Sequence, residues 1–191
     1  MTTRTVAPET MLPQSMGMAL FIISESVLFA MLFASYFYIR SGVEQWPPDG
    51  IEVPKLATPA IATLILLTSS ATMVWAERGA KQQGGRNLRA GLLVTFLLGA
   101  VFLGIQASEW YRETMSISDN AYASLFYTIT GFHGAHVIVG LAMNVFVQAV
   151  AWRKPRAITD SLVRNVSWYW HFVDGIWLVV IAVVYLSPRL M

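Results

Sequence analysis

Residues 16–39 read MGMALFIISESVLFAMLFASYFYI, an apolar run in which Glu25 is the only charged side chain. A helix needs roughly 20 predominantly apolar residues to cross a hydrocarbon layer about 30 Å thick. The run exceeds that length, and it is continuous, whereas the strands of a membrane barrel alternate apolar and polar residues. It therefore predicts a membrane-spanning helix.

Four further apolar runs follow, and we expect helices over about 59–75, 90–110, 125–151 and 168–186. The third run reaches residue 110 only if the carboxylate of Glu109 faces protein or the membrane interface. Composition agrees, with 13% charged residues and a mean hydropathy of +0.54, where soluble domains have about 25% charged residues. The sequence predicts an all-α integral membrane bundle of five transmembrane helices, a single domain over 16–191 that follows a tail at 1–15.

The positions of Lys and Arg predict the orientation of this bundle, because short connections rich in these residues stay in the cytoplasm. Nine of the 13 lie in the tail and in the connections at 77–89 and 152–167, and four lie on the other side. We therefore expect the N-terminus inside and the C-terminus outside. The first run is longer than a signal-peptide core and no clear cleavage site follows, so we expect the cytoplasmic tail to be retained.

Composition also excludes several classes of protein. The chain has no cysteine and three histidines, which excludes a disulfide scaffold, thiolate zinc, an iron–sulfur cluster and thiol-bridged copper. No phosphate-binding loop, nucleophile–base pair or zinc signature occurs. A net charge of +2 gives no reason to expect nucleic acid.

Ionisable residues inside a bilayer are costly, and they are functional candidates for that reason. Glu25 lies deep in the first run. One interpretation is a protonated glutamate that hydrogen-bonds across a helix interface, and the other is a role in proton handling or in placing buried water. His133 and His136 are three residues apart and share a helix face, at a depth that suits a hydrogen bond from either one to Glu25. One of the two histidines could instead serve packing.

His171 and Asp174 form a second pair, three residues apart in the first turns of the last expected helix. Two interpretations of this pair are equally open. The side chains could hydrogen-bond to each other or to another helix, or they could have a catalytic role. The surrounding Trp168, Tyr169, Trp170 and Trp177 indicate either an interface belt or a packing surface. For Glu109, at the outer boundary, we expect a solvated carboxylate.

A haem held by two histidines needs imidazoles at similar depth on different helices. His133 and His136 point the same way from one helix, and His171 is expected about 5 Å from the inner surface, with His136 about 14 to 22 Å in. The predicted mismatch argues against haem, and three histidines are too few for a haem–copper oxygen-reducing site. We therefore expect neither a metal ligand set nor a catalytic residue in this chain.

Long motifs nevertheless resemble one known family. The stretches are MGMALFIISESVLFAMLFASYFYIR, WPPDGIEVP, LGIQASEWYRETMSISDNAYASLFYTITGFHGAHVIVG and WYWHFVDGIWLVV, which occur in this order over most of the chain. Together they resemble subunit III of the haem–copper oxidases, in the shorter five-helix bacterial form that lacks the first two of seven helices. The SEWY and SISDNAY wording is closer to cytochrome c oxidases than to quinol oxidases.

The resemblance implies an accessory subunit of a proton-translocating cytochrome c oxidase in the bacterial plasma membrane. Subunit I would be the main contact, with subunit II in the same complex, and haem and copper would belong to those partner subunits. Glu25 matches the buried, carbodiimide-reactive carboxylate of the family. The subunit as a whole is thought to support proton uptake into the catalytic subunit and the stability of that subunit during turnover. Structural phospholipid is also implied, although the cleft that holds it in seven-helix members uses the two helices absent here.

The residues by themselves do not exclude three other functions. A quinol oxidase subunit is the nearest alternative. A small proton-coupled transporter could use Glu25 and the histidine pair as a relay, and a membrane cytochrome b would require the depth argument to fail.

Overall fold

Five long helices make up the chain in a computed structural model that describes residues 13–48, 54–81, 85–153 and 160–190. They are α1 (Pro13–Ser41), α2 (Ala57–Lys81), α3 (Gly85–Arg112), α4 (Ala121–Arg153) and α5 (Asp160–Val180), which continues into a π-helical segment (Ile181–Leu186) and a 3₁₀ turn (Ser187–Arg189). Each of the five is long and apolar enough to cross a membrane. The expected all-α bundle of five membrane-spanning helices is confirmed.

The helices are longer than the apolar runs that predicted them. The largest difference is at α5, which begins at Asp160 and not at 168. Hydropathy marks only the part of a helix in contact with hydrocarbon, whereas backbone hydrogen bonding continues into the interface, where long polar side chains reach water. The expected tail at 1–15 lies largely outside the described residues, and its last three residues already belong to α1.

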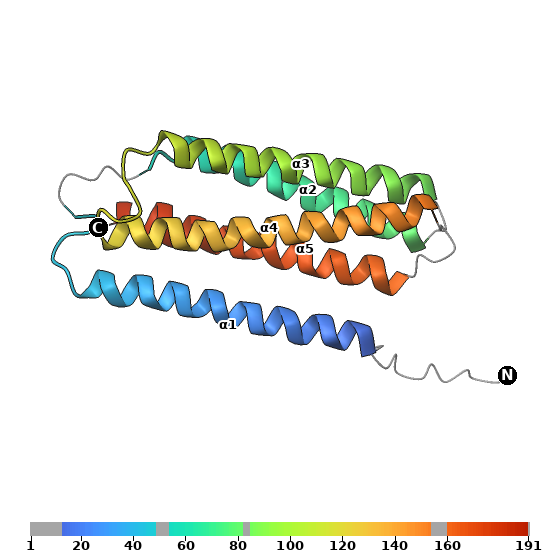
Figure 1. The fold of residues 1–191 in the computed structure, drawn as a ribbon, viewed down its shortest axis with the longest axis horizontal. Coiled ribbons are helices and arrows are strands. Elements are labelled where there is room, and N and C mark those ends of the chain that lie inside the picture. The colour runs from blue at the N-terminus through green and yellow to red at the C-terminus, as the bar shows by residue number, and fades with distance from the viewer. Residues whose placement is uncertain (1–12, 49–53, 82–84, 154–159, 191) are drawn as a thin grey trace.

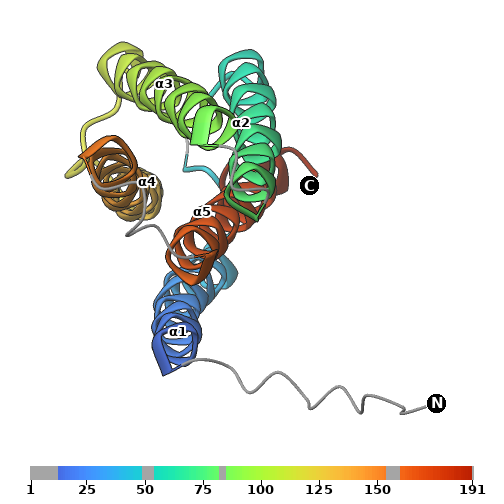
Figure 2. The ribbon, with the colours of Figure 1, turned by 90° about the vertical axis from the view of Figure 1, so that its right-hand side faces the viewer.

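The helices run side by side with the C-terminal end of the chain opposite the start of α1 (Figure 1). Seen from the end, α2, α5 and α1 follow one another, α3 lies beside α2, and α4 lies against α5 (Figure 2). The pairs α2 and α3, α3 and α4, α4 and α5, and α5 and α2 are in contact, and α1 contacts α4 and α5. Four helices thus enclose the interior and α1 is added to one side.

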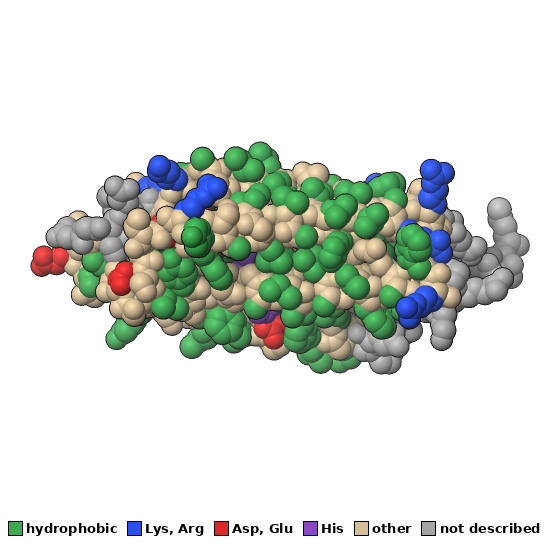
Figure 3. All heavy atoms as spheres, turned by 45° about the horizontal axis from the view of Figure 1, so that its top comes forward, with side chains coloured by type: hydrophobic (Ala, Val, Ile, Leu, Met, Phe, Trp, Pro, Cys, Tyr) green, Lys and Arg blue, Asp and Glu red, His purple; other side chains and the backbone are tan. Residues whose placement is uncertain are grey.

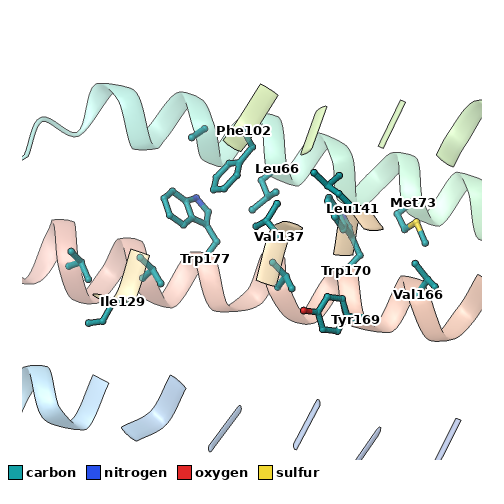
Figure 4. Close-up of a cluster of buried hydrophobic side chains, with 14 of the residues drawn as sticks. Leu66, Met73, Phe102, Ile129, Val137, Leu141, Val166, Tyr169, Trp170 and Trp177 are labelled. Atoms are coloured by element: carbon teal, nitrogen blue, oxygen red, sulfur yellow. The ribbon is translucent and has the colours of Figure 1, made fainter. Parts of the chain in front are cut away.

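Large aromatic side chains fill the interior. Trp170 and Trp177 of α5 are about 1% exposed, and Trp177 meets the ring of Phe102 edge-on at a centroid distance of 4.8 Å (Figure 4). Tyr169 is equally buried, and Trp168 is half-buried. Of the two interpretations of the aromatic group, the packing surface is therefore the right one for Tyr169, Trp170 and Trp177.

The outer surface suits a lipid environment. Figure 3 shows hydrophobic side chains over the middle of one face and Lys and Arg toward its two ends, with an acidic and a histidine side chain together near the middle. Apolar side chains such as Leu64 and Met31 are more than 60% exposed. Hydrocarbon replaces water as the outer solvent at these positions.

Candidate functional site

Glu25 of α1 and His136 of α4 meet in the membrane-spanning part of the bundle. The Oε2 atom of Glu25 lies 2.9 Å from Nε2 of His136, and the other ring nitrogen, Nδ1, lies 2.7 Å from the carbonyl oxygen of Phe132. A carbonyl only accepts, so Nδ1 must carry the hydrogen of that bond. One further proton can then lie on either Nε2 or Oε2, and the pair is neutral overall in both arrangements.

The surroundings of this pair are aromatic on the protein side. The ring of Phe29 lies 4.9 Å from the imidazole of His136, and that of Phe172 lies 6.5 Å away. The side chains of Glu25 and His136 are 20% and 12% exposed. Ser24 and Ser26 give their hydroxyl hydrogens to carbonyls of α1 itself, so the serines that flank Glu25 in sequence do not hold its carboxylate.

His133, the other histidine expected as a partner for Glu25, lies elsewhere. It is fully buried, neither ring nitrogen has a hydrogen-bond partner among the described residues, and its ring stacks on Trp177 at 5.0 Å. Phe102 meets it edge-on at 5.6 Å. The three-residue spacing puts both histidines on one side of α4, but it turns His136 toward α1 and His133 toward the aromatic interior.

His171 and Asp174 lie at the contact of α5 with α2. Nδ1 of His171 is 2.7 Å from Oγ of Ser70, a cross-helix hydrogen bond. The shortest distance between His171 and Asp174 is 3.9 Å, from Nδ1 to Oδ2, which is too long for a hydrogen bond. Both carboxylate oxygens of Asp174 are buried without a hydrogen-bond partner in the described part of the chain.

The prediction of a solvated Glu109 is wrong. Its carboxylate is only 6% exposed, and Oε2 accepts a hydrogen bond of 2.9 Å from the hydroxyl of Tyr185 and a longer one of 3.4 Å from Nε2 of Gln106. Helix α3 runs on to Arg112, so Glu109 still belongs to the helix, and its side chain is enclosed by the bundle. Gln106 could have been noticed from its i, i+3 spacing to Glu109. Tyr185 lies in an apolar run and gave no such signal.

The predicted depth of His171 is also wrong. His171 lies about 16 Å along α5 from Asp160 at 1.5 Å per residue, and the ring of its neighbour Phe172 lies 6.5 Å from that of His136. The two histidines are therefore nearly level, not at the mismatched depths that we expected. The depth argument against haem therefore fails, although the three histidines have three different kinds of neighbour. Within the described ranges, no group of three or more His, Cys, Asp and Glu side chains could hold a metal ion.

Comparisons with known proteins agree with the motifs quoted above. The model of the family "Cytochrome c oxidase subunit III" matches residues 6–188. The chain is 38% identical to cytochrome c oxidase subunit 3 of Thermostichus vulcanus, over 91% of this chain and 87% of that protein. It is 37% identical to a probable cytochrome c oxidase subunit 3 of Rickettsia bellii, over 89% and 67%, and 36% identical to subunit 3 of Oryctolagus cuniculus, over 88% and 67%.

Proposed function

Because this chain belongs to the cytochrome c oxidase subunit III family, we propose that it is a non-catalytic subunit that docks on the catalytic subunit I and supports proton uptake there through Glu25 and His136. Its membership in an oxidase complex follows from the family, as do aerobic respiration and proton translocation by that complex. The chain is a multi-pass protein of the plasma membrane. The names of its relatives do not favour a quinol oxidase.

The redox centres of the complex, haem and copper, belong in this proposal to the partner subunits. The side chains of this chain suit such a division of labour. The three histidines are the best metal ligands available in a chain without cysteine. His136 and His171 hydrogen-bond to Glu25 and Ser70, and His133 is enclosed by aromatic rings. Subunit I would be the main contact, subunit II would belong to the same complex, and phospholipid would fill the remaining lipid-facing surface.

The observation that carries the proton-related role is the 2.9 Å contact between Glu25 and His136. The two groups share one proton beyond the hydrogen on Nδ1, and moving it between Oε2 and Nε2 leaves the net charge of the pair unchanged. Such a pair can give up or accept a proton at mid-membrane depth while its aromatic neighbours restrict water. This is what a subunit needs if it is to keep a proton available beside a catalytic partner.

Removing the chain tests the proposal as a whole. We expect a complex without it to reduce oxygen at first and to lose activity progressively during turnover, because the redox centres stay in place while proton supply fails. Oxygen consumption followed over many turnovers measures this, with the complex carrying the full chain as the control. An immediate and complete loss of oxygen reduction would contradict an accessory role.

A further inference from the structure

A second polar group lies on a different side of α5 from the one that faces the Glu25–His136 pair. Phe172 faces His136, while the preceding residue, His171, turns to Ser70 of α2. Asp174, one turn further along α5, is 5% exposed and lies 3.9 Å from His171. These three side chains, which we call the α2–α5 polar notch, are about 16 to 21 Å along α5 from Asp160, well inside the span.

The polar notch opens on a bare face of α5. In the end view, α1, α2 and α4 lie around α5, and no described helix covers its remaining side (Figure 2). His171, Gly175, Leu178 and Ala182 follow one another along this side at spacings of three or four residues. His171 is 35% exposed and Leu178 46%. A Cβ atom added to Gly175 would have nothing within 4 Å, so there is open space beside this glycine.

The exposed ring nitrogen of His171 has no hydrogen-bond partner among the described residues, and lipid chains cannot provide one. Whichever way the hydrogen lies between Nδ1 and Ser70, the outer nitrogen Nε2 is left as either a donor or an acceptor. No described residue hydrogen-bonds this atom, and hydrocarbon chains offer it nothing. His171 is also more exposed than Glu25 or His136, whose side chains are 20% and 12% exposed. A polar group of another protein at the same depth would supply a hydrogen bond to Nε2.

We propose that the bare α5 face around His171 and Gly175 is the docking surface for one transmembrane helix of the catalytic subunit, which places a hydroxyl or amide side chain against Nε2 of His171. The glycine lets that helix approach closely, as small residues do at helix interfaces in membranes. A hydroxyl or amide side chain suits this position because it can donate to or accept from Nε2, whichever tautomer His171 adopts. This inference rests on the proposed docking on subunit I and adds the face and the chemistry of the contact.

Two exposed glycines provide a matched test. Gly175→Leu places a branched side chain on the proposed face, and Gly104→Leu does the same on α3, where an added Cβ also meets nothing within 4 Å. Leucine is a better helix former than glycine, so neither change should harm the isolated chain. The oxidase is extracted in mild detergent through a tag on subunit I, and the amount of this chain retained is divided by its amount in the membrane.

We expect Gly175→Leu to lower retention at least about fivefold, the loss of one important interface contact, and Gly104→Leu to leave it unchanged. Equal retention of the two variants, or a loss with Gly104→Leu alone, would overturn the assignment of the face. His171→Leu should lower retention as well, and His171→Gln, which keeps a donor and an acceptor, should restore most of it. If the wild-type chain is not retained with subunit I, the proposed docking on subunit I is wrong. That result differs from a loss of retention seen only in the Gly175 and His171 variants, which concerns the docking face.

Photo-crosslinking keeps the inference testable if a variant is poorly inserted. A photoreactive phenylalanine replaces Leu178 on the proposed face or Leu97 on α3, which are 46% and 54% exposed. We expect an adduct of this chain with subunit I from position 178 and none from position 97. An adduct from 97 without one from 178 would place the interface elsewhere.

Discussion

At the scale of single residues, Glu25 and Glu109 are two carboxylates of the membrane-spanning helices that are held in different ways. Glu25 faces a histidine, which can take its proton. Glu109 faces the hydroxyl of Tyr185 and the amide of Gln106, groups that donate hydrogen bonds but do not readily exchange a proton at neutral pH. Of these two, only the first arrangement gives the carboxylate a partner that can take up its proton, which is why the proton-related role is assigned to Glu25.

The first residue-scale prediction concerns Glu25→Gln. The amide is close in shape to the acid and can still donate to Nε2 of His136, so we expect the amount of assembled complex to stay within about twofold of wild type, since one replaced hydrogen bond changes stability by about 1 kcal/mol or less. The exchangeable proton is lost, so activity should decay faster during turnover. Complex yield and oxygen consumption over time measure the two effects.

The control for Glu25→Gln is Ser24→Ala. Ser24 is next to Glu25, but its hydroxyl bonds to the carbonyl of Phe21 on its own helix. We expect this variant to behave as wild type in both measurements. Loss of the assembled complex in Glu25→Gln would instead mean that the carboxylate holds the structure together.

Sequence reasoning predicted a contact of Glu25 with His136 or His133, of which the structure contains the first, and it missed the neighbours of Glu109. Glu25 and His136 are isolated polar residues in apolar runs, and their depths suited a contact. The choice of His136 over His133 depends on which way α4 is rotated, and no residue spacing reveals that rotation. Tyr185 was missed because a tyrosine in an apolar run looks like any core aromatic, and without it Glu109 seemed to need water.

At the scale of helices, the existence of all five could be predicted and their ends could not. A continuous apolar run requires a helix in lipid because every backbone polar group must be satisfied internally. The ends depend on how far polar residues such as Asp160 and Arg164 can extend a helix through the interface. The late start expected for the last helix then produced the wrong depth for His171.

Close contact between helices gives an element-scale prediction for Gly91 of α3. An added Cβ there would lie 2.8 Å from both the Cβ and the backbone nitrogen of Ala76 on α2, and moving backbone to make room costs about 1–3 kcal/mol. We expect Gly91→Ala to lower the temperature at which the chain loses its folded, monodisperse form in detergent. Heating followed by size-exclusion chromatography measures this temperature.

Gly104→Ala is the matched variant on the same helix. An added Cβ meets nothing within 4 Å, and alanine is favoured over glycine in helices by up to about 1 kcal/mol. Its transition should stay at or above that of wild type. If both alanine variants behave alike, then α2 and α3 are not held together by close backbone approach at Gly91.

At the scale of the whole molecule, the topology gathers basic residues at one end. The start of α1, the end of α2, the start of α3, the end of α4 and the start of α5 share that end (Figure 1). Arg78 and Lys81 lie in the last turns of α2 and Arg153 ends α4. At the opposite end lie Arg40, which donates to Ser187, and the exposed acidic residues Glu44 and Asp119. This asymmetry is the basis for expecting the basic end in the cytoplasm.

Single cysteines can test that orientation cleanly, because the chain has none of its own. Ser118→Cys lies in the exposed connection between α3 and α4, and Asn87→Cys lies at the exposed start of α3, at the other end of the bundle. A membrane-impermeant maleimide added to intact spheroplasts should modify Ser118→Cys and spare Asn87→Cys until the membrane is opened with detergent. The reverse pattern would place the N-terminus outside. The Lys- and Arg-rich connections would then lie on the outer surface. This would break the rule that short connections rich in these residues stay in the cytoplasm.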